Sequence, residues 1–244
     1  MEQRSYAVAG LPPPVELDVH EVRVGNVFDE ASAEVYGQKW TINLAVIMVC
    51  ACSLALQMPF GILLNLGLPH TLVGLLVAVQ NLVGVWFSTT TAAGLVMMAI
   101  FCAVNRRIET TMAFRYVWDG ERTMALVVLG LIQGALVTVG LVLLVIPGIY
   151  LSVAYSFAVP LMVEKNLGVW ESLETSRKKV TSQVWGVLLV YILFAVLFVL
   201  SIFTLGIALI WVVPVSLVAQ GVMYRTLFGV GADNQDPEAM PAFA

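Results

Sequence analysis

The sequence predicts an all-α polytopic membrane protein with six transmembrane helices as three hairpins, each preceded by a cytoplasmic amphipathic segment. Three long blocks, residues 40–105, 123–163 and 180–224, contain no Asp, Glu, Lys or Arg. A helix that crosses the hydrocarbon core needs about 20 apolar residues, so each block is long enough to cross twice. The composition agrees, because 60% of the residues are hydrophobic and 11% are charged, against about 25% charged in a typical soluble domain.

The charged residues fall in four segments, 1–39, 106–122, 164–179 and 225–244. Basic residues mark the cytoplasmic side of a membrane, because their translocation is disfavoured. If each charge-free block is a hairpin, all four segments lie on that side and both termini are cytoplasmic. The rival topology has three crossings in the first block, which would strand the N-terminal basic residues opposite Arg106, Arg107, Arg115 and Arg122.

Breaker residues near the middle of each block predict the turns of the hairpins. They are Gly67-Leu68-Pro69-His70, Pro147-Gly148 and the weaker Thr204-Leu205-Gly206. The predicted spans are residues 41–65, 75–104, 124–146, 149–165, 184–203 and 206–224. The fourth is only about 25 Å long at 1.5 Å per residue, so it either penetrates partway or packs on protein. These spans form a membrane domain at 24–228, between an extended cytoplasmic tail at 1–23 and a disordered one at 229–244.

Two of the segments that precede the hairpins carry a helical stripe of apolar residues. Before the first span the stripe is Val24, Val27, Phe28, Ala31 and Val35. Before the fifth span it is Val169, Trp170, Leu173, Val180 and Val184. The third segment, Ile108 to Trp118, is poorly striped. We expect the segment before the fifth span to lie in the plane of the membrane interface.

This interfacial segment is the candidate contact with lipid headgroups or with a partner protein. The residues for that role are Trp170 and the basic cluster Arg177, Lys178 and Lys179. Each basic residue contributes about 1 kcal/mol to binding anionic lipid. The alternative is that the segment is only an elbow that anchors the hairpin. Membrane lipids are therefore the expected partners, other membrane proteins are candidates, and no basic patch predicts nucleic-acid binding.

Neutral polar residues inside the spans define a candidate polar pathway. They are Gln57, Asn65, Gln80, Asn81 and Gln133. Hydrogen bonds between helices, at about 0.6 kcal/mol each, are the alternative explanation for such residues. A pump or coupled transporter is disfavoured, because ionisable groups within the membrane usually mark ion coupling and the bodies of these spans have none. Prolines should kink three of the helices, at Pro59, Pro160 and Pro214.

Glu164, at the end of the fourth span, is the best single titratable candidate, with a solvated helix-end charge as the alternative. The cysteines have no CxxC spacing and are predicted to pack as small apolar residues: Cys50, Cys52 and Cys102. His20 and His70 are predicted on opposite sides of the membrane. The sequence therefore predicts no metal site and no cofactor.

Residues 145–180, VIPGIYLSVAYSFAVPLMVEKNLGVWESLETSRKKV, carry a proline-glycine turn, Tyr155, Glu164 and the spaced pair Ser172 and Ser176. With the weaker segment FDEASAEVYGQKW before the first span, they resemble a largely uncharacterised bacterial family of six-helix integral membrane proteins. That family is similar to the membrane domain of some glycerophosphodiester phosphodiesterases. The resemblance implies the six-helix fold and the bacterial inner membrane. It carries over no catalytic residue, because the phosphodiesterase activity belongs to a soluble domain for which no polar segment here is long enough.

These observations predict an integral membrane protein without a catalytic site, acting as a scaffold or assembly factor in the bacterial inner membrane. The alternative is a passive or lipid-directed transporter that uses the uncharged polar pathway. An enzyme acting on lipid headgroups is a third hypothesis. It lacks an identifiable base, nucleophile or metal partner for Glu164, Glu171 and Glu174.

Overall fold

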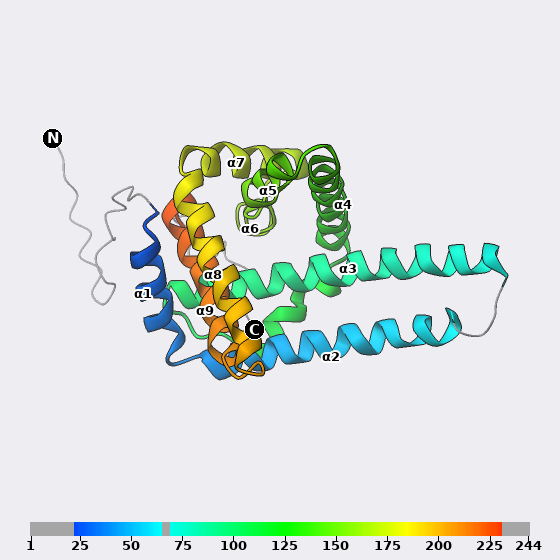
Figure 1. The fold of residues 1–244 in the computed structure, drawn as a ribbon, viewed down its shortest axis with the longest axis horizontal. Coiled ribbons are helices and arrows are strands. Elements are labelled where there is room, and N and C mark those ends of the chain that lie inside the picture. The colour runs from blue at the N-terminus through cyan, green and yellow to red at the C-terminus, as the bar shows by residue number, and fades with distance from the viewer. Residues whose placement is uncertain (1–21, 65–68, 231–244) are drawn as a thin grey trace.

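The computed structural model describes residues 22–64 and 69–230 (Figure 1). Within these ranges the chain forms nine α-helices, one 3-10 helix and no strand, which confirms the all-α prediction. The two predicted tails fall almost wholly outside the described residues and stay predictions.

The helices follow the predicted order of a short helix and then a hairpin, three times over. The first unit is α1 (Val24–Val35), α2 (Lys39–Leu64) and α3 (His70–Ala103). The second is η1 (Thr110–Val117), α4 (Gly120–Leu143), α5 (Val145–Ala154) and α6 (Ala158–Glu164). The third is α7 (Val169–Ser182), α8 (Val184–Phe203) and α9 (Leu209–Phe228). The first charge-free block thus forms two helices rather than the three of the rival topology.

Six helical segments of the described chain are long and apolar enough to cross a membrane, which agrees with a multi-pass membrane protein. The outer part of the first hairpin shows why lipid is needed around it. Leu54, Met58 and Leu75 expose 66%, 66% and 62% of their surface. Contiguous apolar surface of this kind is rarely left to water, whereas acyl chains cover it without cost.

Several helix boundaries differ from the prediction. Helix α5 begins at Val145, so the predicted turn at Pro147-Gly148 lies inside it and the break falls at Leu144 instead. Three other boundaries differ for local reasons. Helix α3 begins at His70 instead of 75, because Pro69 fits just outside the first turn, where no donor is needed. Helix α9 begins at Leu209 instead of 206, since Leu205 and Gly206 have left-handed backbones with φ of 53° and 83°. It then continues to Phe228, where Gly229, with φ of 67°, ends it.

The fourth span is broken into two helices instead of being kinked at Pro160. Helix α5 ends at Ala154 and α6 begins at Ala158. Proline has no N–H, so Pro160 cannot bond the carbonyl of Ser156, four residues earlier, and the helix is interrupted there. Half of this span's most apolar window is buried in the protein, more than for any other candidate span. Irregular backbone at membrane depth is tolerated where protein covers it, as here.

Side chains from other helices bond the carbonyls that the interruptions leave open. The Gln220 amide nitrogen donates to the Ser156 carbonyl at 3.3 Å, and the Ser176 hydroxyl donates to the Ala154 carbonyl at 2.7 Å. Pro214 likewise leaves the carbonyl of Ile210 without its helical donor. The Asn43 amide nitrogen supplies one at 2.9 Å. Gln220 and Asn43 thus donate to backbone carbonyls that have lost their helical donor to a proline.

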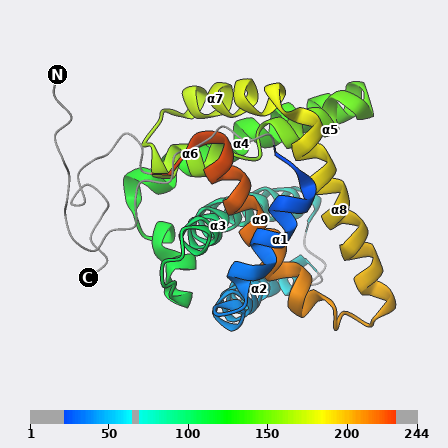
Figure 2. The same ribbon diagram turned by 90° about the vertical axis from the view of Figure 1, so that its left-hand side faces the viewer.

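Two buried clusters hold the helices together, one around α1, α3, α8 and α9 and one around α4, α6 and α7. Figure 1 shows α2 and α3 side by side, extending beyond the rest of the protein, with α9 crossing their ends. Figure 2 looks along this hairpin and shows α1 beside α9 across the same ends. At the crossing of α3 and α9, any side chain at Gly221 would collide with the carbonyl of Ala99.

Candidate functional site

A charged junction joins three helices at the end of α9. The Arg225 guanidinium donates to the carbonyl of Ala103, at the C-terminus of α3, and to the carboxylate of Glu30 in α1. It also lies 3.8 Å from a carboxylate oxygen of Glu34, one turn further along α1. A helix C-terminus has unpaired carbonyls and partial negative charge, so a cation is favoured there. Arg225 therefore ties α1 and α3 to α9.

Glu34 is the titratable group of this junction. Its second carboxylate oxygen is buried and has no hydrogen-bond partner. Burial raises the pKa of Glu34 to about 7, the nearby Glu30 carboxylate acts in the same direction, and Arg225 opposes both. The thiol of Cys102 lies 3.7 Å from the backbone carbonyl of Glu34. The junction can thus take up and release a proton near neutral pH. The sequence indicates Glu164, and not Glu34, as the titratable candidate.

Glu164 lies at the end of α6 and accepts a hydrogen bond from the hydroxyl of Tyr224 in α9. The Tyr224 side chain is fully buried. The neighbouring Lys165 ammonium donates to the carbonyl of Phe228 at 2.9 Å. Both charged residues therefore link the broken fourth span to the last one.

Helix α7 presents the predicted lipid or partner surface. Its inner face buries Leu173, Ser176 and Val180, whereas Trp170 is 68% exposed. Arg177 and Lys178 both pair with the carboxylate of Glu174, at 2.7 Å and 3.4 Å. These bonds lower the pKa of Glu174, the Arg177 hydrogen bond most of all. Two of the three basic side chains are thus shared with an acid on the same helix. Lys178 stays exposed together with the Trp170 indole, whereas Lys179 is half-buried.

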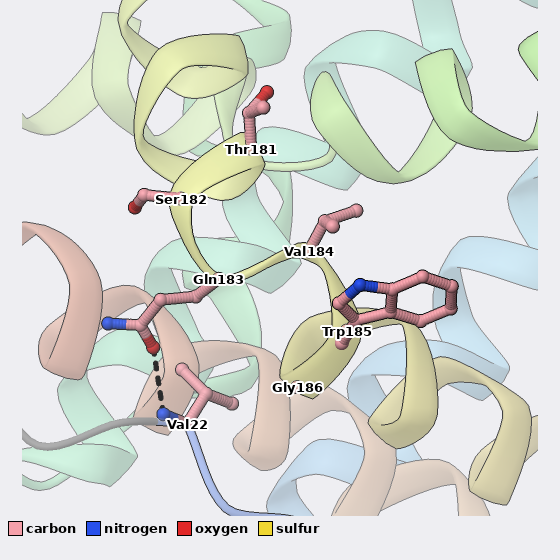
Figure 3. Close-up of a pocket in the computed structure, with 7 residues that line it drawn as sticks. All are labelled: Val22, Thr181, Ser182, Gln183, Val184, Trp185 and Gly186. Carbon is pink, nitrogen blue, oxygen red and sulfur yellow. Dashed lines mark hydrogen bonds between the residues drawn. The ribbon is translucent and has the colours of Figure 1, made fainter.

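A pocket of about 360 Å³ lies at the junction of α7 and α8 (Figure 3). Figure 3 shows Gln183 and Val22 facing each other across it, and the Val22 N–H donates to the Gln183 side chain at 2.8 Å. Any side chain at Gly186 would collide with the Val22 carbonyl, so this glycine allows the chain before α1 to approach α8. The remaining lining residues are Thr181, Ser182, Val184 and Trp185. The pocket thus marks the point where the first and third units meet.

The structure does not bring the predicted polar pathway together. Gln57 and Asn81 are exposed on the first hairpin, while Gln80 and Gln133 are half-buried. Within the described residues, no hydrogen bond joins any of these side chains to another of them. Asn65 lies outside the described residues.

In the described part of the chain, no group of three or more His, Cys, Asp or Glu side chains could hold a metal ion. Cys50, Cys52 and Cys102 are free thiols, the last of them buried. Comparison with protein-family models, curated proteins and solved structures finds no match to this chain.

Sequence reasoning missed the charged junction and the roles of Asn43 and Gln220. Glu30 and Arg225 are 195 positions apart, and nothing in their local sequence links them. The amides did carry a usable signal. Each proline inside a span identifies one open carbonyl four residues earlier, and a neutral amide in another span is the natural donor.

Proposed function

We propose that this integral membrane protein is a non-enzymatic scaffold or assembly factor of the bacterial inner membrane. It holds other membrane or envelope components on its cytoplasmic face. The observation that carries the proposal is the construction of α7, whose inner face is fixed to the second hairpin while Trp170, Glu171 and Lys178 point outward. A rigid helix with an exposed aromatic anchor and a charged rim suits protein docking.

The placement of the polar residues favours this role over a passive or lipid-directed transporter. A transport path requires its polar groups around a common cavity, whereas Gln57 and Asn81 lie exposed on the projecting hairpin. Asn43 and Gln220 are occupied with backbone carbonyls. An enzyme acting on lipid headgroups is disfavoured by the pairing of Glu174 with Arg177 and Lys178, which leaves that acid in an ion-pair network.

In-membrane crosslinking tests the proposal. A photoreactive residue at Trp170 should give reproducible adducts with a small set of proteins, and Lys178→Glu should weaken those adducts. The same probe at the exposed Trp118 of the second unit is the matched control and should not give this set. Substitution is preferable to deleting the helix, because deletion would also remove the buried Leu173 and Val180. An adduct pattern at Trp170 that matches the control would reject the scaffold role of α7.

A further inference from the structure

The position of α9 relative to the first hairpin restricts how the third hairpin can sit in a membrane. Near the start of α9, the ring of Trp211 lies 5.6 Å from that of Tyr36 and 4.1 Å from the ammonium of Lys39, at the start of α2. The Asn43 bond to Ile210 belongs to the same contact. The first turn of α9 is therefore at the depth of the start of α2.

The other end of α9 meets the last residues of α3, which lie at the same end of the hairpin as the start of α2. Gly221 packs on Ala99, and Arg225 bonds the Ala103 carbonyl at the end of α3. Because α2 and α3 run antiparallel side by side, the start of α2 and the end of α3 lie on one face of the membrane that they cross. Helix α9 has 20 residues and is about 30 Å long, the thickness of the hydrocarbon core. A helix of this length with both ends on one face lies along that face.

Helix α1, which packs against α8 and α9, supports the same placement of the third hairpin. Its start is tied to the beginning of α8, through Val22 and Gln183, and its end reaches Trp211. Between these points it carries Glu30 and Glu34, which face Arg225. A helix with these acids does not cross a bilayer, so the hairpin that runs alongside it lies at the same depth.

The outer surface of α8 shows what this hairpin contacts. One face of α8 buries Val187, Val190 and Phe194 against the protein. The opposite face is an uncharged row of exposed large side chains, named here the α8 stripe: Trp185, Leu189, Ile192, Val196, Val199 and Phe203. We infer that the third hairpin lies along the membrane instead of across it, within the leaflet on the charged side, with the α8 stripe against acyl chains.

The depth of the neighbouring residues in the membrane indicates what covers the α8 stripe. The start of α2 brings exposed Trp40 to the same level, where an indole marks the boundary of headgroups and acyl chains. A helix in this plane buries its apolar face about 5–10 Å below the headgroups. Apart from the indole N–H of Trp185 at its first turn, the α8 stripe offers no polar group to a protein partner, whereas acyl chains need none.

Three measurements on the full-length protein in cells and liposomes test this placement. A short bifunctional maleimide should join Tyr36→Cys to Trp211→Cys in the membrane, since it can span the gap that the two rings fill, which shows that the contact exists there. Ile207→Cys, in the turn of the third hairpin, should resist an impermeant maleimide in intact spheroplasts and react after permeabilisation. His70→Cys, at the turn of the first hairpin, is the external control. A fluorophore at Ile192→Cys should be quenched several-fold more by phospholipids brominated on the acyl chains than by unbrominated ones.

External labelling of Ile207→Cys would overturn the inference, because the third hairpin would then cross. Failure of the Tyr36–Trp211 pair to crosslink would overturn it as well. If Ile192→Cys instead forms a disulfide with a second copy and bromine does not quench it, another copy covers the α8 stripe and the lipid assignment is wrong. The scaffold role of α7 is tested separately, so it stands or falls on its own experiment.

Discussion

Replacing Glu34 by glutamine should remove a pH dependence from the stability of the protein. Glu34 has an ordinary pKa of 4.5 and a pKa of about 7 in the folded protein, chiefly because its carboxylate is buried. Between these values the folded state binds more protons than the unfolded state, so stability falls as pH rises through this window. The loss is complete above pH 7 and absent below pH 4.5.

The magnitude follows from the size of the pKa change. At about 1.4 kcal/mol per pKa unit, ionised Glu34 destabilises the fold by at most about 3.5 kcal/mol. Its side chain is 22% exposed, so solvent screening reduces this value. Glu34→Gln keeps the shape of the protonated acid and cannot ionise. The variant should therefore be only slightly more stable than the parent at pH 5 and clearly more stable at pH 8.

Unfolding in detergent micelles at pH 5 and pH 8 measures this effect. For a chain of this size, about 2–4 °C of melting temperature corresponds to 1 kcal/mol, so the gain at pH 8 is several degrees. Glu30→Gln is the matched control, because Glu30 bonds Arg225 directly and its loss should destabilise the protein at both pH values. If the stability of Glu34→Gln fell between pH 5 and pH 8 as steeply as that of the parent, Glu34 would not be the titrating group.

Two further predictions concern the carbonyls that proline leaves open. Gln220→Leu should lower the free energy of unfolding by about 1 kcal/mol, since the Ser156 carbonyl loses its donor. Gln133→Leu is the control. It removes no such bond and should be close to neutral in the same unfolding assay. Asn43→Leu should lower the free energy of unfolding by a similar amount in the parent. It should lower it distinctly less in a Pro214→Ala background, because alanine restores the N–H that bonds the Ile210 carbonyl. Equal losses in both backgrounds would contradict this explanation.

The number and order of the hairpins were predictable, because they depend on local composition. A block without charge between charged segments identifies a hairpin, and the fifth span begins and ends at the predicted residues 184 and 203. The break in the fourth span was not predictable from Pro160 alone, since proline kinks some helices and interrupts others. Pro59 and Pro214 lie inside continuous helices. The surrounding donors, Ser176 and Gln220, decide the outcome and come from distant segments.

The candidate site was predicted only in part. The helical stripe of α7 groups Trp170 with Leu173 and Val180, yet the structure buries Leu173 and Val180 and exposes Trp170. The pairing of Glu174 with Arg177 and Lys178 also needed the structure, because each basic residue has several rotamers available. The charged junction could not be predicted from the sequence, for another reason. It depends on α9 crossing the first hairpin, and hydropathy sets the length of a helix without setting its direction.

The most direct test of the account is a map of which side of the membrane each charged segment occupies. The map uses three single-cysteine variants of a protein whose native cysteines Cys50, Cys52 and Cys102 are replaced. They are His70→Cys in the first turn, Trp118→Cys in the second unit and Lys178→Cys in α7. An impermeant reagent should label intact cells only at His70→Cys, and the other two cysteines should react only after permeabilisation. External labelling at Trp118→Cys or Lys178→Cys would place the charged face outside the cell and contradict the proposed cytoplasmic scaffold.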